Sequence, residues 1–369
     1  MTLNTYRASI KSAIVAVAAT MLILMSCSGP KDRGLITVTA DMNAVTDIPV
    51  SEGRLIPLDN SDSCALLDNV INIEMDKDRF YVLTRKSVKS FDNGDGRYLT
   101  TYGSIGQGPG EYTSIKQMWL EDGILYIYDF NTNIAHSFKP DGSTIASTKE
   151  YYDRKTPGMG PTSKFPYPDN SCYIMLNTYT DGTTDTNPLA SVHDKDMNRI
   201  KPVEGRNVPG GNLDNQVAAD PANNRLLYWE ALKDTIFAIT TDTIKPAYAV
   251  DFGKLRFPAQ DNNNVFEKMY AFSNAIKNGA EYATLIQNVQ KWDNLVFFVF
   301  TTGKSRFFIG VIDEDKDTDN MKIYRIDDPR YSQKALIKIF GDDLYVLLND
   351  EEDEDANPAL LVIPAKKFK

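Results

Sequence analysis

Four aspartates near the C-terminal end of the chain alternate with other residues, as the oxygen ligands of calcium loops do. They are Asp313, Asp315, Asp317 and Asp319. An EF-hand loop that began at Asp313 would need glycine and glutamate where the chain has Thr318 and Tyr324. The pattern therefore favours a solvated hairpin tip, and no metal ligand is assigned. The six consecutive acids from Asp350 to Asp355 repel one another, which predicts an exposed, mobile loop.

His136 and His193 are the only histidines of the chain. Neither lies at a spacing that suits a metal site, and zinc needs more nitrogen or sulfur ligands than these two supply. The Gly-x-Ser-x-Gly sequence of a nucleophile elbow is absent. A Ser-His-Asp triad stays open, because its members can be far apart in sequence. We assign no catalytic residue and no cofactor.

A glycine-rich segment could at first suggest a phosphate-binding loop. Gly106, Gly108 and Gly110 alternate, but Pro109 removes one backbone amide and the following residues are strand-like. Phosphate loops need glycines that open a helix, whose N-terminal amides bind the anion. We therefore expect a tight crossover between two structural units.

Three tryptophans offer flat apolar surfaces that could stack on a sugar ring. Trp119, Trp229 and Trp292 all lie near expected strands. Packing in the core is the more common role of such residues. A sugar site would require a tryptophan at a strand end beside acids or amides.

The N-terminal segment has the composition of an export signal. Arg7 and Lys11 precede thirteen residues, 13–25, of which only Thr20 is polar. This run is shorter than the roughly 20 apolar residues that span a bilayer. It ends in Leu-Met-Ser before Cys27, which resembles the bacterial lipobox.

In a lipobox the cysteine thiol takes a diacylglyceryl group, the chain is cut before it, and the new amine is acylated. Two or three acyl chains on Cys27 would anchor the protein stably, because each buried CH₂ contributes about 0.8 kcal/mol. We therefore expect a signal peptide over 1–26, a lipidated tether over 27–34 and a folded body over 35–369. The alternative is an ordinary secretory signal with a chance cysteine.

The charge of the chain argues against some partners. Residues 1–26 contain two basic residues and no acids, so their removal changes the formal net charge from −10 to −12. Such an acidic protein repels nucleic acid and anionic lipid. Beyond Cys27 only Cys64 and Cys172 remain. Two cysteines are not a disulfide framework, so buried free thiols are the more favoured expectation, with a disulfide left open.

The body of the chain is predicted to be all-β. Short runs rich in aromatic and branched residues alternate with Asn-Gly and Asp-Gly turn signals such as those at 93–96, 122–123, 141–142 and 181–182. The strongest runs are 79–83, 124–128, 226–229, 296–300 and 344–348. These are the lengths and compositions of half-buried strands.

The runs recur at a period typical of propeller blades. Tyr81 and Tyr126 lie 45 residues apart, and each is followed by a phenylalanine and an Asp-Gly turn. Looser units follow at about 165–205, 215–257, 285–326 and 333 to the end. A period of about 40 to 50 residues with four strands predicts a six-bladed β-propeller with four-stranded antiparallel blades. A pair of β-sandwiches is the alternative.

Two further elements complete this prediction. Residues 54–58 are expected to close the ring by pairing with the late strand 359–363 of the last blade. Residues 265–277 carry apolar residues at helical spacing before Asn278-Gly279, which predicts one short helix inserted between blades.

Residues 102–112 (YGSIGQGPGEY) resemble a signature of six-bladed β-propeller lipoproteins of gut-type Gram-negative bacteria, related in fold to NHL and TolB-like propellers. Residues 233–237 (KDTIF) and 357–363 (NPALLVI) are similar to two other segments of that family. The resemblance spans nearly all of the body. It implies the propeller fold and an envelope location, and it supplies no catalytic residues.

The expected function is that of a membrane-anchored envelope lipoprotein whose propeller is a non-catalytic interaction module. A glycan, a peptide or an envelope protein would be its partner, and the outer membrane its location, on either face. One alternative is a calcium-dependent hydrolase of the lactonase type, with carboxylates around the central channel. Another is a structural subunit of an outer-membrane uptake complex.

Overall fold

The structure is a computed structural model that describes residues 34–369 except 130, 133, 150–163, 177–187, 208–215, 231, 259–264, 304–305, 317–318 and 354. The predicted signal peptide, Cys27 and the turn at 181–182 lie outside the described residues. No helix of the described part is long and apolar enough to cross a membrane.

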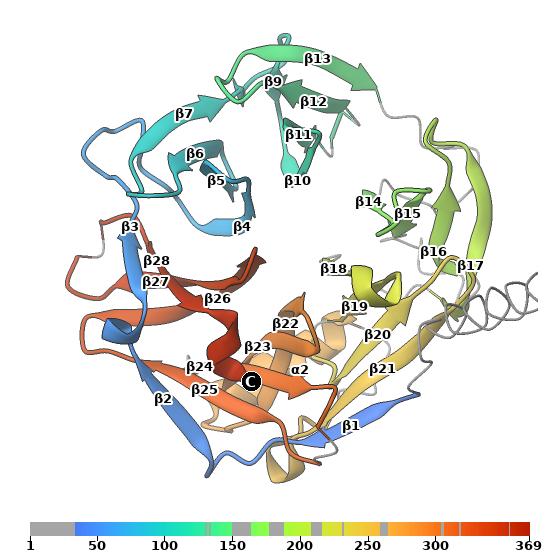
Figure 1. Ribbon diagram of the computed structural model, residues 1–369, viewed down its shortest axis with the longest axis vertical. Helices are drawn as coiled ribbons and strands as arrows, with labels where there is room; N and C mark the ends of the chain where they lie inside the picture. The colour runs from blue at the N-terminus through green and yellow to red at the C-terminus, as the bar shows by residue number, and fades with distance from the viewer. Residues whose placement is uncertain are drawn as a thin grey trace, which may run out of the picture.

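Six sheets stand around a common axis, so the predicted six-bladed β-propeller is confirmed (Figure 1). We number the blades in chain order, and each runs from its innermost to its outermost strand. Blade 1 contains β4 (Val70–Met75), β5 (Arg79–Thr84), β6 (Val88–Asp92) and β7 (Tyr98–Tyr102). Blade 2 contains β10 (Ile115–Glu121), β11 (Ile124–Asp129), β12 (Ile134–Phe138) and β13 (Thr144–Lys149). Blade 3 contains β14 (Lys164–Pro166), β15 (Tyr173–Leu176), β16 (Pro188–His193) and β17 (Arg199–Asn207).

The second half of the ring has the same order of strands. Blade 4 contains β18 (Gln216–Asp220), β19 (Arg225–Trp229), β20 (Thr235–Ile239) and β21 (Ile244–Asp251). Blade 5 contains β22 (Ala283–Trp292), β23 (Leu295–Thr302), β24 (Arg306–Asp313) and β25 (Lys322–Asp327). Blade 6 contains β26 (Tyr331–Phe340), β27 (Asp343–Asp350), β28 (Ala359–Pro364) and β3 (Arg54–Pro57). Short 3₁₀ turns lie at Val50–Glu52, Pro221–Asn223, Gly253–Leu255 and Ala365–Phe368.

The N-terminal segment wraps the outer edges of three blades. β1 (Ile36–Thr39) pairs in parallel with β21, and β2 (Val45–Pro49) pairs in parallel with β25. β3 then pairs antiparallel with β28, which confirms the predicted closure of the ring. Blades 4 and 5 therefore have a fifth, parallel strand in addition to the predicted four. In Figure 1 these three strands follow the rim in blue.

The apolar core lies between blades. Five clusters of buried side chains each join two neighbouring blades, at the contacts 1–2, 3–4, 4–5, 5–6 and 6–1. On the side of blade 2 that faces blade 3, the described residues form only a small cluster of Trp119, Tyr128 and Ala135. The Tyr173 hydroxyl crosses to the Glu121 carboxylate at 2.8 Å there. The described apolar cluster at this contact is thus smaller than those at the other five.

The direction of the strands gives the ring two different faces. Turns between the first and second and between the third and fourth strands of each blade lie on one face, which we call the turn face. Connections between blades, and turns between second and third strands, lie on the other face, which we call the crossover face. The predicted helix is present as α2 (Val265–Lys277), in the connection from blade 4 to blade 5. It therefore lies on the crossover face.

The glycine-rich loop is a crossover, as predicted. β8 (Ser104–Ile105) and β9 (Glu111–Tyr112) pair in parallel between blades 1 and 2. The Glu111 carboxylate accepts a hydrogen bond of 2.7 Å from the Gly108 amide, inside the loop. A Cβ at Gly106 would lie 2.0 Å from that carboxylate, so a side chain at this position would displace Glu111. The loop binds its own glutamate where a phosphate loop would bind an anion.

Asn357 stabilises blade 6, where β3 closes the ring by pairing with β28. Its side-chain Nδ2 donates to the carbonyls of Asp59 (2.6 Å) and Ala65 (3.0 Å), and its Oδ1 accepts from the Leu67 amide (2.8 Å). Asn357 is buried, so each of these groups would otherwise lose its hydrogen bond away from water. One side chain near the C-terminal end thus holds the connection from β3 to β4.

Replacement of Asn357 by alanine should therefore destabilise the fold by about 2–4 kcal/mol, because one buried and two partly buried backbone groups lose their partner. Urea unfolding followed by tryptophan fluorescence measures this change. Asn43→Ala is the matched control, since the Asn43 side chain makes a single exposed hydrogen bond to Asp41. Equal effects of the two substitutions would contradict a locking role for Asn357.

Candidate functional site

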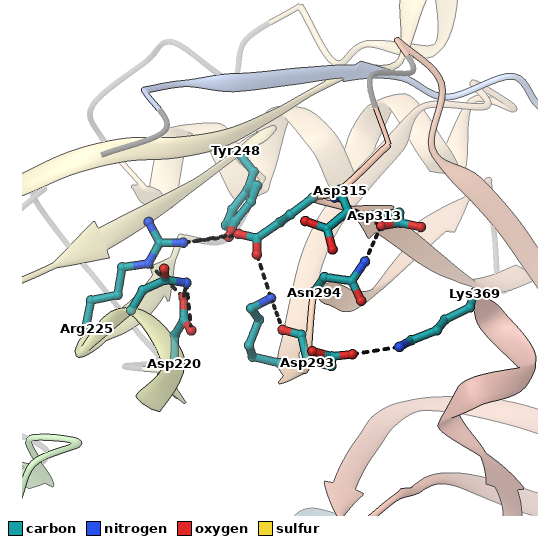
Figure 2. A network of polar contacts seen from close by, with 11 residues as sticks. Asp220, Arg225, Tyr248, Asp293, Asn294, Asp313, Asp315 and Lys369 are labelled. Carbon is teal, nitrogen blue, oxygen red and sulfur yellow. Dashed lines mark hydrogen bonds and ion pairs between the residues drawn. The ribbon is translucent and has the colours of Figure 1, made fainter. Parts of the chain in front are cut away.

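A connected set of charged side chains lies on the turn face where blade 4 meets blade 5 (Figure 2). Its members come from the turn after β18, from β19 and β21, from the turn between β22 and β23, from the loop after β24 and from the C-terminus. They are Asp220, Asn223, Arg225, Tyr248, Lys291, Asp293, Asn294, Asp313, Glu314, Asp315 and Lys369. We call this set the blade 4–5 network. It is the strongest candidate for a functional site in the described chain.

Arg225 connects the two blades within this network. Its Nε donates to Asp220 at 2.7 Å, and its second nitrogen donates to the Tyr248 hydroxyl at 2.7 Å. The same nitrogen lies 3.4 Å from Glu314 of blade 5. Asp220 is fully buried and also accepts from Asn223. The buried carboxylate thus has a cation and an amide donor, as a buried charge requires.

Glu314 is the centre of the network. Its Oε1 accepts from the Tyr248 hydroxyl and Arg225, and its Oε2 accepts from Lys291 at 2.8 Å. Burial raises the pKa of Tyr248, so its hydroxyl stays protonated and acts as a donor. The side chains of Glu314 and Lys291 are 7% and 2% exposed, so this pair is shielded from solvent.

The C-terminus joins the outer part of the network. Lys369 pairs with Asp293 at 2.6 Å, and the preceding Phe368 ring packs edge-to-face on Phe297 at 5.3 Å. The Asn294 amide donates to the Asp313 carboxylate in the same region. The last residues of the chain therefore tie blade 6 to blade 5 on the turn face.

The chemistry that this arrangement supports is structural. A general base needs a carboxylate or imidazole with a free lone pair at the reacting group, and a nucleophile needs an adjacent base. In the blade 4–5 network both oxygens of Glu314 and both oxygens of Asp220 already accept hydrogen bonds. The network pairs its buried charges and joins two blades.

Carboxylates on the innermost strands could in principle hold a metal in the central channel. The six innermost strands carry three such residues, Glu74, Glu121 and Asp220, each on a different blade. Glu74 pairs with Lys338 at 2.7 Å, Glu121 accepts from Tyr173, and Asp220 binds Arg225. In the described part of the chain no three acids, histidines or cysteines come together in a way that suits a metal ion.

Two of the four alternating aspartates, Asp313 and Asp315, belong to the blade 4–5 network. Asp315 and Asp319 are exposed, which agrees with the predicted hairpin tip, while Asp317 lies outside the described residues. Asp313 is largely buried and accepts from Asn294 and Lys316. Glu314, between two of these aspartates, was missed by the sequence analysis. Its partners lie 23 to 89 residues away in sequence, so no local spacing could indicate it.

Each histidine contacts a serine within its own blade. His136 Nδ1 lies 2.9 Å from the Ser147 hydroxyl, and His193 Nε2 lies 3.0 Å from the Ser191 hydroxyl. The other ring nitrogen of His193 meets the Met197 carbonyl, and Nε2 of His136 is buried without a partner. Neither contact includes the carboxylate that orients the histidine of a triad.

The three tryptophans occupy different environments. Trp119 stacks on Tyr126 of the same blade, with ring centroids 5.1 Å apart, and Trp229 is buried in the core between blades 4 and 5. Trp292 lies at a strand end beside an acid, as a sugar site would require, and its Nε1 donates to Asp342. Its ring, however, is already covered by the ammonium of Lys369 at 5.1 Å.

The predictions about the cysteines and about the acidic run at 350–355 are partly confirmed. Both cysteines are free, but the expectation that both thiols are buried is wrong for Cys64, which is exposed, while Cys172 is buried. In the acidic run, residues 351–353 and 355 are exposed, whereas Asp350 pairs with Arg330 at 2.6 Å. The turn before β26 therefore fixes one end of this segment.

Comparison with known proteins supports the architecture. The model of a family described as "Domain of unknown function (DUF4934)" matches residues 37–365. A candidate exported protein from Bacteroides fragilis NCTC 9343 has a similar structure, with 17% identity, a TM-score of 0.62, and coverage of 90% of this chain and 99% of that chain. A member of the DUF4221 family from Bacteroides vulgatus ATCC 8482 has 12% identity and a TM-score of 0.56, over 84% of this chain and 96% of that chain. These identities show a shared fold alone. No protein with a curated description matches.

Neutralising Glu314 should destabilise the protein strongly. In Glu314→Gln the buried Lys291 loses its anion, and the loss of one partner from a buried ion pair costs about 3–5 kcal/mol. Denaturant unfolding measures the change. Glu352→Gln is the control, because the Glu352 carboxylate is 72% exposed at 3.7 Å from Arg330 and should leave stability unchanged. A Glu314→Gln variant as stable as this control would show that the network is dispensable.

Acidification should weaken the fold through its histidines. Burial lowers the pKa of His136 and His193 below the ordinary value of 6.5. The unfolded chain therefore binds protons first, so this stability is complete above about pH 6.5 and is lost as the pH falls toward the lowered values. Melting temperatures at pH 7.5 and 5.0 should differ less in the His136→Gln/His193→Gln variant than in the parent protein. Equal differences would exclude the histidines as the cause.

Proposed function

This chain belongs to the family described as domain of unknown function DUF4934, and from that premise we propose that it is an envelope lipoprotein whose six-bladed propeller binds a partner without catalysing a reaction. The pairing of the interior charges carries the non-catalytic part of this proposal. The acids of the blade 4–5 network and the innermost strands all have partners within the protein. The ring then serves as a rigid support, and recognition takes place on its loops and edges.

The sequence before the ring supports the membrane anchor. The lipobox-like Leu-Met-Ser at 24–26 precedes Cys27, whose thiol would carry the lipid. Eight residues lie between Cys27 and Ile36, the first residue of β1, so an extended tether would reach about 30 Å. The description of the Bacteroides fragilis neighbour as a candidate exported protein agrees with such an address.

The position of β1 determines where the lipidated tether would leave the ring. Ile36 lies opposite Tyr248 on the outer edge of blade 4, so the tether would leave the ring at its rim. Both faces of the ring would then remain open to a glycan, a peptide or another envelope protein. We propose the outer membrane as the location of the anchored protein.

Substitution of Cys27 by alanine tests the anchor. Cells that express the parent chain and are fed radiolabelled palmitate should yield a labelled protein in the membrane fraction, because acylation requires the Cys27 thiol. Cys27→Ala should remove the label and shift the protein to the soluble fraction. Cys64→Ala is the matched control and should keep both label and membrane fraction. An unlabelled parent protein, or a labelled Cys27→Ala variant, would refute the anchor.

A further inference from the structure

The outer edges of the six blades are protected in different ways. Outermost strands present unpaired backbone amides and carbonyls, so an open edge is a template for another strand. β1 and β2 are added outside the four strands of blades 4 and 5. Blade 6 ends in β3 as its own fourth strand, and the turn at 93–97 of blade 1 lies against it, where Arg54 donates to the Gly94 carbonyl at 3.0 Å. Blades 1, 2 and 3 end in β7, β13 and β17, to which no further strand is added within the described residues.

Turns from the next blade cover two of these three edges. The turn at 139–143 lies against β7, where the Tyr102 hydroxyl donates to the Pro140 carbonyl and a Cβ at Gly142 would lie 2.9 Å from Thr100. The turn at 240–243 lies against β17, where the Glu204 amide donates to the Asp242 carbonyl. β17 also contains a proline and several charges, which discourage strand addition.

β13 has no such protection in the part of the chain that the structure describes. Its residues from Thr144 to Thr148 are exposed and uncharged, the strand contains no proline, and its one charged residue is Lys149 at its end. On its inner side β13 pairs with β12, and a contact with Gly110 at Thr144 touches one end. The exposed Ile145 adds an apolar side chain to this edge. β13 has the properties of an accepting strand.

The molecule itself shows what the outer position of a blade accepts. β1 contributes Ile-Thr-Val-Thr to blade 4, in parallel, with Ile36 to Thr39 opposite Tyr248 to Asp251. β2 does the same on blade 5. Both additions are short, extended and rich in branched residues. Among the described strands, none lies outside β13 of blade 2.

We propose that the outer edge of β13 takes up an extended, uncharged peptide segment of another polypeptide as a fifth, parallel strand. The backbone of β13 supplies the hydrogen bonds, and Ile145 supplies an apolar contact. This proposal rests on the function proposed above, since it names the surface and the kind of partner of the binding module.

The test uses a labelled peptide with the sequence of residues 35–40, Leu-Ile-Thr-Val-Thr-Ala, which already fits one blade edge. Fluorescence anisotropy with the purified full chain measures its affinity. Ile145→Lys should weaken binding about tenfold, because a lysine at an edge opposes strand addition. Ile200→Lys is the matched control: Ile200 is also the second residue of an outer strand and 59% exposed, against 45% for Ile145. It should bind within about twofold of the parent chain.

Hydrogen exchange locates the bound peptide. Residues 144–149 should become protected in the parent chain and not in Ile145→Lys, and a peptide with proline in place of its valine should give no protection. Absence of binding, or equal weakening by both lysine variants, would overturn the proposal. Binding insensitive to Ile145→Lys would place the peptide elsewhere, for instance on β21 in exchange with β1, and would also overturn it.

Self-association is a separate outcome. If sedimentation shows a dimer that Ile145→Lys dissociates, the occupant of β13 is a second copy of this chain and the peptide proposal is wrong. Failure of the lipid anchor would change the palmitate label and leave the peptide affinity unchanged, so the two proposals fail in distinguishable ways.

Discussion

The fold depends on one constraint: each blade has two apolar faces and can bury neither of them alone. β23 is an example, because the six residues of this strand from Leu295 to Phe300 are all buried. Leu295, Phe297 and Val299 pack toward blade 6, while the residues between them pack toward blade 4. A strand with period-two alternation therefore contributes to two separate cores. Every blade needs a neighbour on both sides, and only a closed ring supplies one to each.

Closure brings charged groups together at places that the chain order does not suggest. Where blade 4 meets blade 5, Arg225 and Lys291 approach Glu314 in a shielded position. Burial of such charges is tolerated when each has a partner, and the specific geometry then favours one arrangement of the two blades over others. The seam between blades 2 and 3 differs, since its described contacts include the bond from Tyr173 to Glu121. The described part of the ring thus has five large apolar clusters between blades and one smaller cluster at this seam.

The sequence predicts those parts of the fold that local pattern determines. Strand runs, Asp-Gly turns and the period near 45 residues depend on neighbours within a few positions, and the helix at 265–277 has its own periodicity. β1 and β2 were not predicted because strands of only four and five residues carry no information about a partner strand more than 200 residues away. Glu314 was missed for the same reason. Cys64 was expected to be buried, but it lies in the exposed connection that Asn357 holds in place.

The open edge on blade 2 follows from how the N-terminal segment closes the ring. Residues 36–57 form one strand for each of blades 4, 5 and 6 and then enter blade 1 through the connection to β4. Residues 36–57 therefore do not extend to the outer edges of blades 1, 2 and 3. The outer edges of blades 1 and 3 are covered by a turn of the following blade, which must extend outward to reach them. The turn of blade 3 at 194–198 instead folds back on its own strands, where Lys195 lies over the Tyr173 ring at 4.3 Å. Added strands and neighbouring turns thus cover the other outer edges, and β13 remains as the accepting edge of the described ring.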